Sequence, residues 1–256
     1  GTFTDVTYLS GVAGRAPTQT ADWADYDGDG DLDLYVGNEQ MATMKAPSEL
    51  FRNNGDGTFT NTAEEAGVRN ERFSKAVTWG DYNGDGRPDI YISNYGQPNR
   101  LYRNNGDGTF TDVAAELKVT EPMQSLPAWF WDVNNDGQLD IFVSGYADDV
   151  AYSAAEAIGM PHDAPLPRLY IADGAGGFHE ASEQYRIARP TAPMGSNFGD
   201  LDNDGRLDFY LGTGEPEFHN LLPNRMYHQR DGHFEDVTRA GRFGHLQKGH
   251  GVVFAD

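Results

Sequence analysis

The chain has no cysteine and comparatively few basic residues. The absence of cysteine excludes disulfide scaffolds, cysteine-ligated zinc, iron–sulfur clusters and thiol nucleophiles. Only 19 Lys and Arg residues oppose 40 Asp and Glu residues, which gives a formal net charge of −21. Such a charge repels the phosphates of nucleic acids and attracts cations. We therefore expect no nucleic-acid partner.

Long apolar runs are also missing. No stretch of the sequence approaches the roughly 18 consecutive apolar residues that a membrane-spanning helix needs, so we expect no membrane insertion. The chain starts at Gly1 without a basic and apolar leader. We expect any export signal to have been removed or to lie outside this sequence.

The main feature that is present is a repeat. Nine-residue segments rich in aspartate and glycine align without gaps, and each is preceded, two positions earlier, by an aromatic residue. The segments are 25–33, 81–89, 132–140 and 200–208, and the aromatic residues are Trp23, Trp79, Phe130 and Phe198. Phe254 and Asp256 match the start of a fifth copy.

Each repeat has the pattern of four short strands, here called A to D. Apolar residues alternate after each acidic segment, as at Ile90 and Ile92, and this period of two predicts a strand B with one buried face. A Gly-rich turn such as 105–108 then predicts a hairpin. Repeated four-stranded antiparallel units predict an all-β propeller, whereas a stacked β-solenoid normally has shorter repeats.

The repeat boundaries predict one propeller domain that is part of a larger ring. The expected parts are a last strand of a preceding blade, four blades of which the third carries an inserted loop at 145–167, and the first strand of a further blade. In chain order these parts are 1–8, 18–66, 73–117, 126–185, 193–239 and 248–256.

The acidic segments join strand A to strand B and have the spacing of a cation-binding loop. Side-chain oxygens occur at positions 1, 3, 5 and 9, glycine occurs at position 6, and position 7 can add a backbone carbonyl. Six or so hard oxygens suit Ca²⁺, and the mutual repulsion of the carboxylates opposes closure of the loop without a cation. We predict about four Ca²⁺ sites, one in each complete A-to-B loop.

The predicted side-chain ligands are Asp25, Asp27, Asp29, Asp33, Asp81, Asn83, Asp85, Asp89, Asp132, Asn134, Asp136, Asp140, Asp200, Asp202, Asp204 and Asp208. The predicted backbone-carbonyl ligands are Asp31, Arg87, Gln138 and Arg206.

Three other interpretations of these segments fit less well. An EF-hand needs a bidentate Glu at position 12, where this chain has apolar residues such as Val36 and Ile92. Mg²⁺ prefers strict octahedral geometry with retained waters. A plain turn built from Asp and Gly needs no cation, but the same register in all four segments favours one.

The acidic segments, together with the aromatic residue before them and the Leu-Asp-Leu-Tyr-Val strand at 32–36, resemble FG-GAP/VCBS repeats, the blades of the integrin α-subunit head. The stretch 99–110 looks most like the cartilage acidic protein branch. The resemblance covers nearly all of the chain. It implies a calcium-binding propeller of roughly seven blades, of which this chain would be a partial ring, in a secreted, cell-surface or periplasmic protein.

The face opposite the acidic loops is the expected binding face. Its longest loop, 145–167, carries Tyr152, His162 and Asp163, and long loops on a rigid scaffold often bind ligands. We expect a non-catalytic protein that binds a protein or a glycan there, as in adhesion or carbohydrate binding. Two alternatives remain: a polysaccharide lyase or hydrolase that uses loop cations such as Arg72 and Arg189, and a structural protein that assembles with other chains.

Overall fold

Within the described part of the chain, sixteen strands form four separate antiparallel sheets of four strands each. The computed structural model describes residues 1–14, 16–40, 44–214, 222–246 and 249–254. In each sheet the strands are hydrogen-bonded in chain order. The all-β prediction and the four-stranded antiparallel unit are therefore confirmed, and the sheets are called blades 1 to 4 below.

The strand bounds follow the predicted repeat. Blade 1 has β1 (Thr18–Ala24), β2 (Asp33–Asn38), β3 (Glu49–Asn53) and β4 (Phe59–Asn61), and blade 2 has β5 (Ser74–Gly80), β6 (Asp89–Asn94), β7 (Arg100–Asn104) and β8 (Phe110–Asp112). Blade 3 has β9 (Ser125–Trp131), β10 (Asp140–Gly145), β11 (Arg168–Ala172) and β12 (Phe178–Glu180), and blade 4 has β13 (Pro193–Gly199), β14 (Asp208–Thr213), β15 (Arg225–Arg230) and β16 (His233–Asp236).

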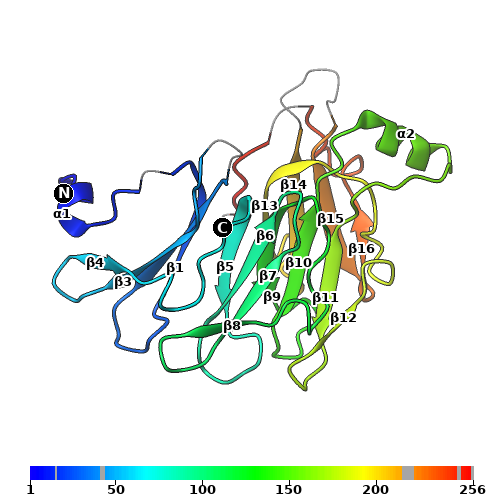
Figure 1. Ribbon diagram of the computed structural model, residues 1–256. Coiled ribbons are helices and arrows are strands. Elements are labelled where there is room, and N and C mark those ends of the chain that lie inside the picture. The colour runs from blue at the N-terminus through cyan, green and yellow to red at the C-terminus, as the bar shows by residue number, and fades with distance from the viewer. Residues whose placement is uncertain (15, 41–43, 215–221, 247–248, 255–256) are drawn as a thin grey trace.

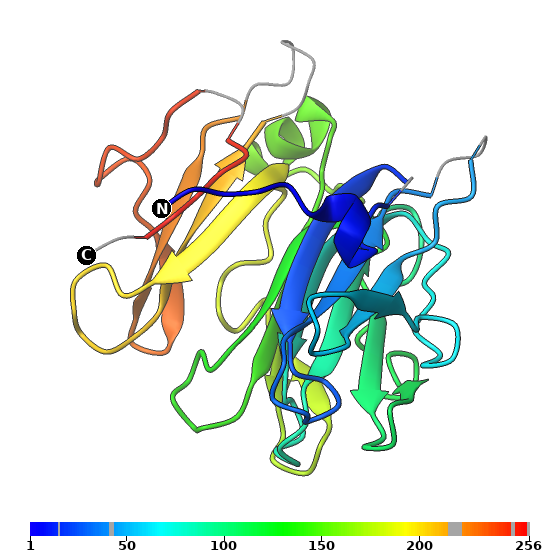
Figure 2. The ribbon, with the colours of Figure 1, turned by 90° about the vertical axis from the view of Figure 1, so that its left-hand side faces the viewer.

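The blades stand side by side in chain order, as propeller blades do (Figures 1 and 2). Their first strands are neighbours: β1 contacts β5, β5 contacts β9, and β9 contacts β13. The contact is close at Gly80, where a Cβ atom would come within 2.7 Å of the Phe130 ring. The absence of a side chain at Gly80 thus permits the close approach of blades 2 and 3, whereas blade 3 has Trp131 at the same position of strand A. That further blades complete a ring stays a prediction.

The second strand of the blades is buried more completely than its apolar alternation predicted. Every residue of β6 and every residue of β10 is buried, so the expectation of a single buried face is wrong for these strands. The reason is that the next blade covers the second face. Tyr91 of β6 packs with Phe130 and Ile141 of blade 3, while Ile90 and Ile92 pack toward blade 1.

The segment before β1 differs from the expectation. Residues 1–6 have no regular structure and Thr7–Ser10 form the short helix α1, so the strand predicted at 1–8 is absent. In the complete blades the corresponding short strand D pairs with strand C of its own blade. Of the segment predicted at 248–256, residues 248, 255 and 256 lie outside the described residues, and 249–254 form no strand.

The two ends of the blades carry different connections. The A-to-B loops and the C-to-D turns share one end, and the insertion of blade 3 lies at the opposite end, where it forms helix α2 (Val150–Ala157) (Figure 1). Asp149 caps this helix by accepting a hydrogen bond from the Ala151 N–H at 2.8 Å. No helix in the described residues is long and apolar enough to cross a membrane.

Candidate metal centres

The four acidic segments join the first and second strands of the four blades, as predicted. They are called loop 1 (25–33), loop 2 (81–89), loop 3 (132–140) and loop 4 (200–208). Each lies directly between two hydrogen-bonded strands, so the strand pair holds both ends of the loop at a fixed separation.

The aspartate at position 1 closes each loop through the backbone. In loop 2, Asp81 accepts hydrogen bonds from the Asp85 N–H at 3.0 Å and the Gly86 N–H at 2.7 Å. The equivalent bonds occur in the other three loops. The glycine at position 6 has a positive φ, 82° at Gly86, which residues with a Cβ atom rarely adopt. The loop is therefore shaped by its own sequence.

The aspartate at position 9 is buried and ties the loop to strand C. One oxygen of Asp89 accepts from the Tyr82 N–H of the loop at 3.3 Å, and the other accepts from the Asn104 N–H of β7 at 2.8 Å. The equivalent aspartate of every loop makes the same pair of bonds. Each oxygen keeps a second lone pair that a metal ion could use. The role of these aspartates as metal ligands stays a prediction, in addition to their observed role as hydrogen-bond acceptors.

Burial raises the pKa of the aspartates at position 9. Desolvation, with a smaller effect of the neighbouring carboxylates, raises the pKa of Asp89 to about 7, although its two backbone hydrogen bonds act in the opposite direction. The same causes raise the pKa of Asp33 and that of Asp140 to about 6. The ionised form of these buried carboxylates is therefore unfavourable unless a positive charge lies nearby.

The loops differ at position 3. In loops 2 and 3 the asparagine there donates to the aspartate at position 5, as Asn83 Nδ2 does to Asp85 at 3.0 Å. In loop 2, Arg87 at position 7 also pairs with Asp85. Loop 1 has no such amide: oxygens of Asp25, Asp27 and Asp29 lie within 4.8 Å of one another. Burial and the charge of Asp29 raise the pKa of Asp27.

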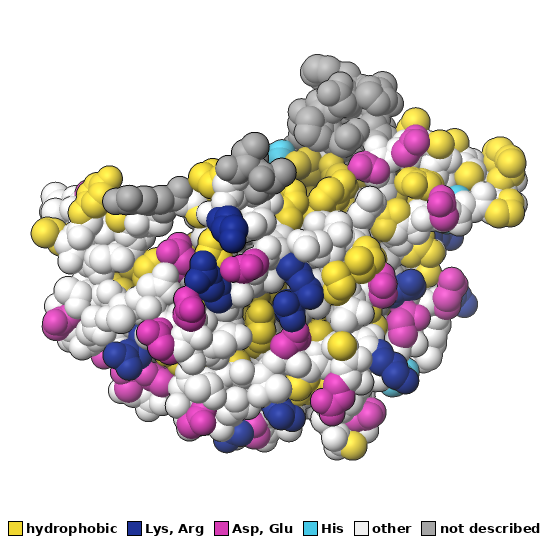
Figure 3. All heavy atoms as spheres, viewed as in Figure 1, with side chains coloured by type: hydrophobic (Ala, Val, Ile, Leu, Met, Phe, Trp, Pro, Cys, Tyr) yellow, Lys and Arg dark blue, Asp and Glu magenta, His cyan; other side chains and the backbone are white. Residues whose placement is uncertain are grey.

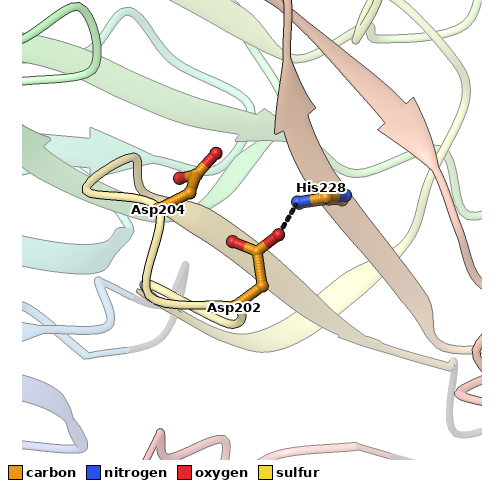
Figure 4. A group of neighbouring side chains, drawn as sticks. All are labelled: Asp202, Asp204 and His228. Carbon is orange, nitrogen blue, oxygen red and sulfur yellow. Dashed lines mark hydrogen bonds and ion pairs between the residues drawn. The ribbon is translucent and has the colours of Figure 1, made fainter.

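Loop 4 gathers two groups of potential ligands. Oxygens of Asp200, Asp202 and Asp208 lie within 4.8 Å of one another, and so do oxygens of Asp202 and Asp204 and a ring nitrogen of His228. Figure 4 shows His228 on β15 facing Asp202 of the loop, with 3.1 Å between Nε2 and Oδ2. The sequence analysis did not include His228 among the predicted metal ligands. The available signal was its position in strand C, directly before Gln229, whose backbone N–H donates to Asp208.

Neighbouring blades are hydrogen-bonded through the loops. Asn104 Nδ2 of blade 2 donates to the Tyr26 carbonyl of loop 1, and Gln229 Nε2 of blade 4 donates to the Val133 carbonyl of loop 3, both at 2.8 Å. Asn135 of loop 3 donates to the Gly205 carbonyl of loop 4 at 2.9 Å. These hydrogen bonds connect the conformation of each loop to the contact between neighbouring blades.

A cavity of about 700 Å³ lies at the opposite end of the blades, beside α2. Arg189, Arg225, Glu156 and Asp236 are among its lining residues. Within the loop 145–167, which was expected to bind a partner, Tyr146 is buried and packs against Tyr95. Parts of the connections between strands B and C of blades 1 and 4, residues 41–43 and 215–221, lie outside the described residues.

Comparison with known proteins agrees with this architecture. Models of the FG-GAP-like repeat match residues 41–92, 81–143 and 147–211. Cartilage acidic protein 1 from Mus musculus and from Homo sapiens is 29% identical over 232 residues, which are 86% of this chain and 32% of the relative. The Xenopus tropicalis protein is 30% identical over 189 residues, 72% of this chain and 27% of the relative.

The chain spans about a third of the length of these curated relatives. Because the repeat models match more than half of its residues and the four blades repeat one strand pattern, the chain belongs to the FG-GAP-like repeat family.

Proposed function

We propose that this chain is a calcium-binding, non-catalytic part of an extracytoplasmic propeller. The observation that carries the proposal is the convergence of carboxylates in loop 1, where oxygens of Asp25, Asp27 and Asp29 lie within 4.8 Å of one another. Hard oxygen donors of this kind are the ligands that Ca²⁺ prefers. Loops 2 and 3 share the backbone shape and replace one carboxylate by an asparagine oxygen.

The proposed role of Ca²⁺ is to make the blades rigid. Bound cation offsets the repulsion among carboxylates, and it binds the folded loop better than the unfolded chain. Because Asn104 and Gln229 connect loops to neighbouring blades, a closed loop also supports the contact between blades.

A partner would bind at the opposite end, and we propose a protein or a glycan there. The cavity beside α2 is lined by three arginines and two acidic residues, which suits a polar partner. Figure 3 shows apolar side chains at the upper right, over α2. Just after this helix in the sequence, Ile158 is 71% exposed and Met160 is 57% exposed. Binding to a panel of glycans, assayed together with release of reducing ends, separates this role from that of a lyase or hydrolase.

The calcium proposal is tested by thermal unfolding in Ca²⁺ and in excess EDTA. At a Ca²⁺ concentration of 100 Kd, one site adds about 2.7 kcal/mol, which for a chain of this size raises the midpoint by about 5–10 °C. We expect Asp25→Asn to reduce the Ca²⁺-dependent shift, and Asp56→Asn, at an exposed aspartate of a C-to-D turn, to leave it unchanged. A midpoint that is the same in Ca²⁺ and EDTA would contradict the proposal.

A further inference from the structure

The residue that faces the acidic loop from strand C differs among the blades. In β3, β7, β11 and β15 it immediately precedes the residue whose backbone N–H is donated to the position-9 aspartate. In chain order it is Arg52, Arg103, Ile171 and His228. An arginine has no lone pair to offer a metal, whereas an imidazole nitrogen has one. Of the four loops, only loop 4 has a nitrogen ligand at this position.

His228 is held in place for contact with the loop. Arg52 and Arg103 are exposed, but the His228 side chain is only 10% exposed. Among the described residues, Asp202 is the one hydrogen-bond partner of its ring. Figure 4 shows the ring directed from β15 toward the carboxylates of the loop.

The distances suit a small dication. Zinc binds imidazole nitrogen at about 2.0–2.1 Å and carboxylate oxygen at about 2.0–2.2 Å, so two such ligands of one ion lie roughly 3 Å apart. Nε2 of His228 lies 3.1 Å from Oδ2 of Asp202. An oxygen of Asp204 lies within 4.8 Å of both groups. A metal would take the place of the proton shared by Nε2 and Oδ2.

The type of ligand selects the type of metal. Imidazole suits Zn²⁺ and related transition ions, whereas Ca²⁺ takes oxygen ligands. With a neutral imidazole and two carboxylates, the group of Asp202, Asp204 and His228 balances the two positive charges of the ion.

We propose that loop 4 binds a transition dication of the zinc class through Asp202, Asp204 and His228 in preference to Ca²⁺, while the other three loops bind Ca²⁺. This inference rests on the proposed function, in which the acidic loops are cation sites. It assigns to one loop a metal different from that of its repeats.

The test is titration of ZnCl₂ into the untagged chain in saturating Ca²⁺, followed by calorimetry and by elemental analysis after dialysis. We expect one equivalent of Zn²⁺ to bind, and His228→Gln to weaken that binding at least about tenfold. His179→Gln removes an exposed histidine and should leave Zn²⁺ binding unchanged. In both variants, the amount of Ca²⁺ bound before zinc is added should stay the same within about one equivalent.

Two further variants keep the test independent of any folding defect at His228. Asp202→Asn keeps the shape of the side chain and should weaken Zn²⁺ binding; Asp27→Asn, at the same position of loop 1, should weaken Ca²⁺ binding but not Zn²⁺ binding. With Co²⁺ in place of Zn²⁺, the visible absorption of a nitrogen-ligated ion should appear in the native chain and not in His228→Gln.

Equal Zn²⁺ binding by the native chain and His228→Gln would overturn the inference. So would Ca²⁺ binding without any Zn²⁺ binding, which would reduce His228 to a partner that balances the charge of Asp202 and would leave the proposed function intact. Failure of both ions to bind would overturn the inference and the proposed function together.

Discussion

The buried aspartate at position 9 of each acidic loop receives backbone hydrogen bonds from two different elements. At Asp89 these are loop 2, through Tyr82, and β7, through Asn104. Charged hydrogen bonds of this kind are strong, yet desolvation by burial raises the pKa of Asp89 to about 7. The carboxylate of Asp89 is thus more stable with a bound proton or metal ion than as an ionised group alone.

This leads to a prediction for the chain in chelator. The folded state holds protons on Asp33, Asp89 and Asp140, whose pKa values are about 6, 7 and 6, at pH values where the unfolded chain has released them. Stability should therefore fall as pH rises from about 4 to about 7. The expected loss at Asp89 alone is on the order of a few kcal/mol.

Urea unfolding in EDTA at pH 5 and pH 7.5 measures this loss. In saturating Ca²⁺ the fall should be smaller or reversed, because the cation keeps the carboxylates ionised. A chelated chain that gains stability between pH 5 and pH 7.5 would be inconsistent with the assigned pKa values.

At the scale of the element, a tyrosine of strand B is hydrogen-bonded to the backbone of the segment that follows strand D. The Tyr91 hydroxyl of β6 donates to the Val119 carbonyl at 2.9 Å, and Tyr35 and Tyr210 make the equivalent bonds in blades 1 and 4. Blade 3 has Phe142 at this position. The repeat therefore tolerates loss of the hydroxyl where the surrounding core compensates.

We expect Tyr91→Phe to lower the free energy of unfolding by about 1–2 kcal/mol, because it leaves a buried carbonyl without its donor. Tyr8→Phe is the control, since Tyr8 is 88% exposed and its change should stay within about 0.5 kcal/mol. Urea unfolding of both variants decides the matter, and equal losses would show that the Tyr91 bond adds nothing.

At the scale of the whole molecule, the same repeat position has different surroundings in different blades. The Trp79 ring packs against Tyr26, Tyr35 and Phe110, and its indole N–H donates to the Asp22 carbonyl at 3.1 Å. Trp23, one repeat earlier, is 50% exposed. Coverage by a neighbouring blade accounts for this difference.

Trp79 is partly buried against the core of blades 1 and 2, so we predict that Trp79→Ala costs about 3 kcal/mol, at the lower end of the range for buried aromatic residues, and that Trp23→Ala costs less than half as much. Equilibrium unfolding in urea compares the two variants directly. Similar costs would mean that packing between blades contributes little to the stability of this chain.

Much of the architecture could be predicted because its signals are local. The acidic loops join strands A and B at the predicted residues, since Asp81 and Gly86 shape the loop through contacts within a few residues. Other features could not be predicted. Burial of both faces of β6 depends on packing against blades 1 and 3, which the alternation within the strand does not specify.

The repeated sequence by itself determined the four-stranded unit, the position of every acidic loop and the oxygens available in it, because hydrogen bonds within a loop and the alternation of a strand need only neighbouring residues. Only the tertiary structure decided which other groups meet those oxygens. His228 lies 26 residues from Asp202 in sequence, and Asn104 lies 78 residues from Tyr26. Pairing of strands within a blade and packing between blades bring them together.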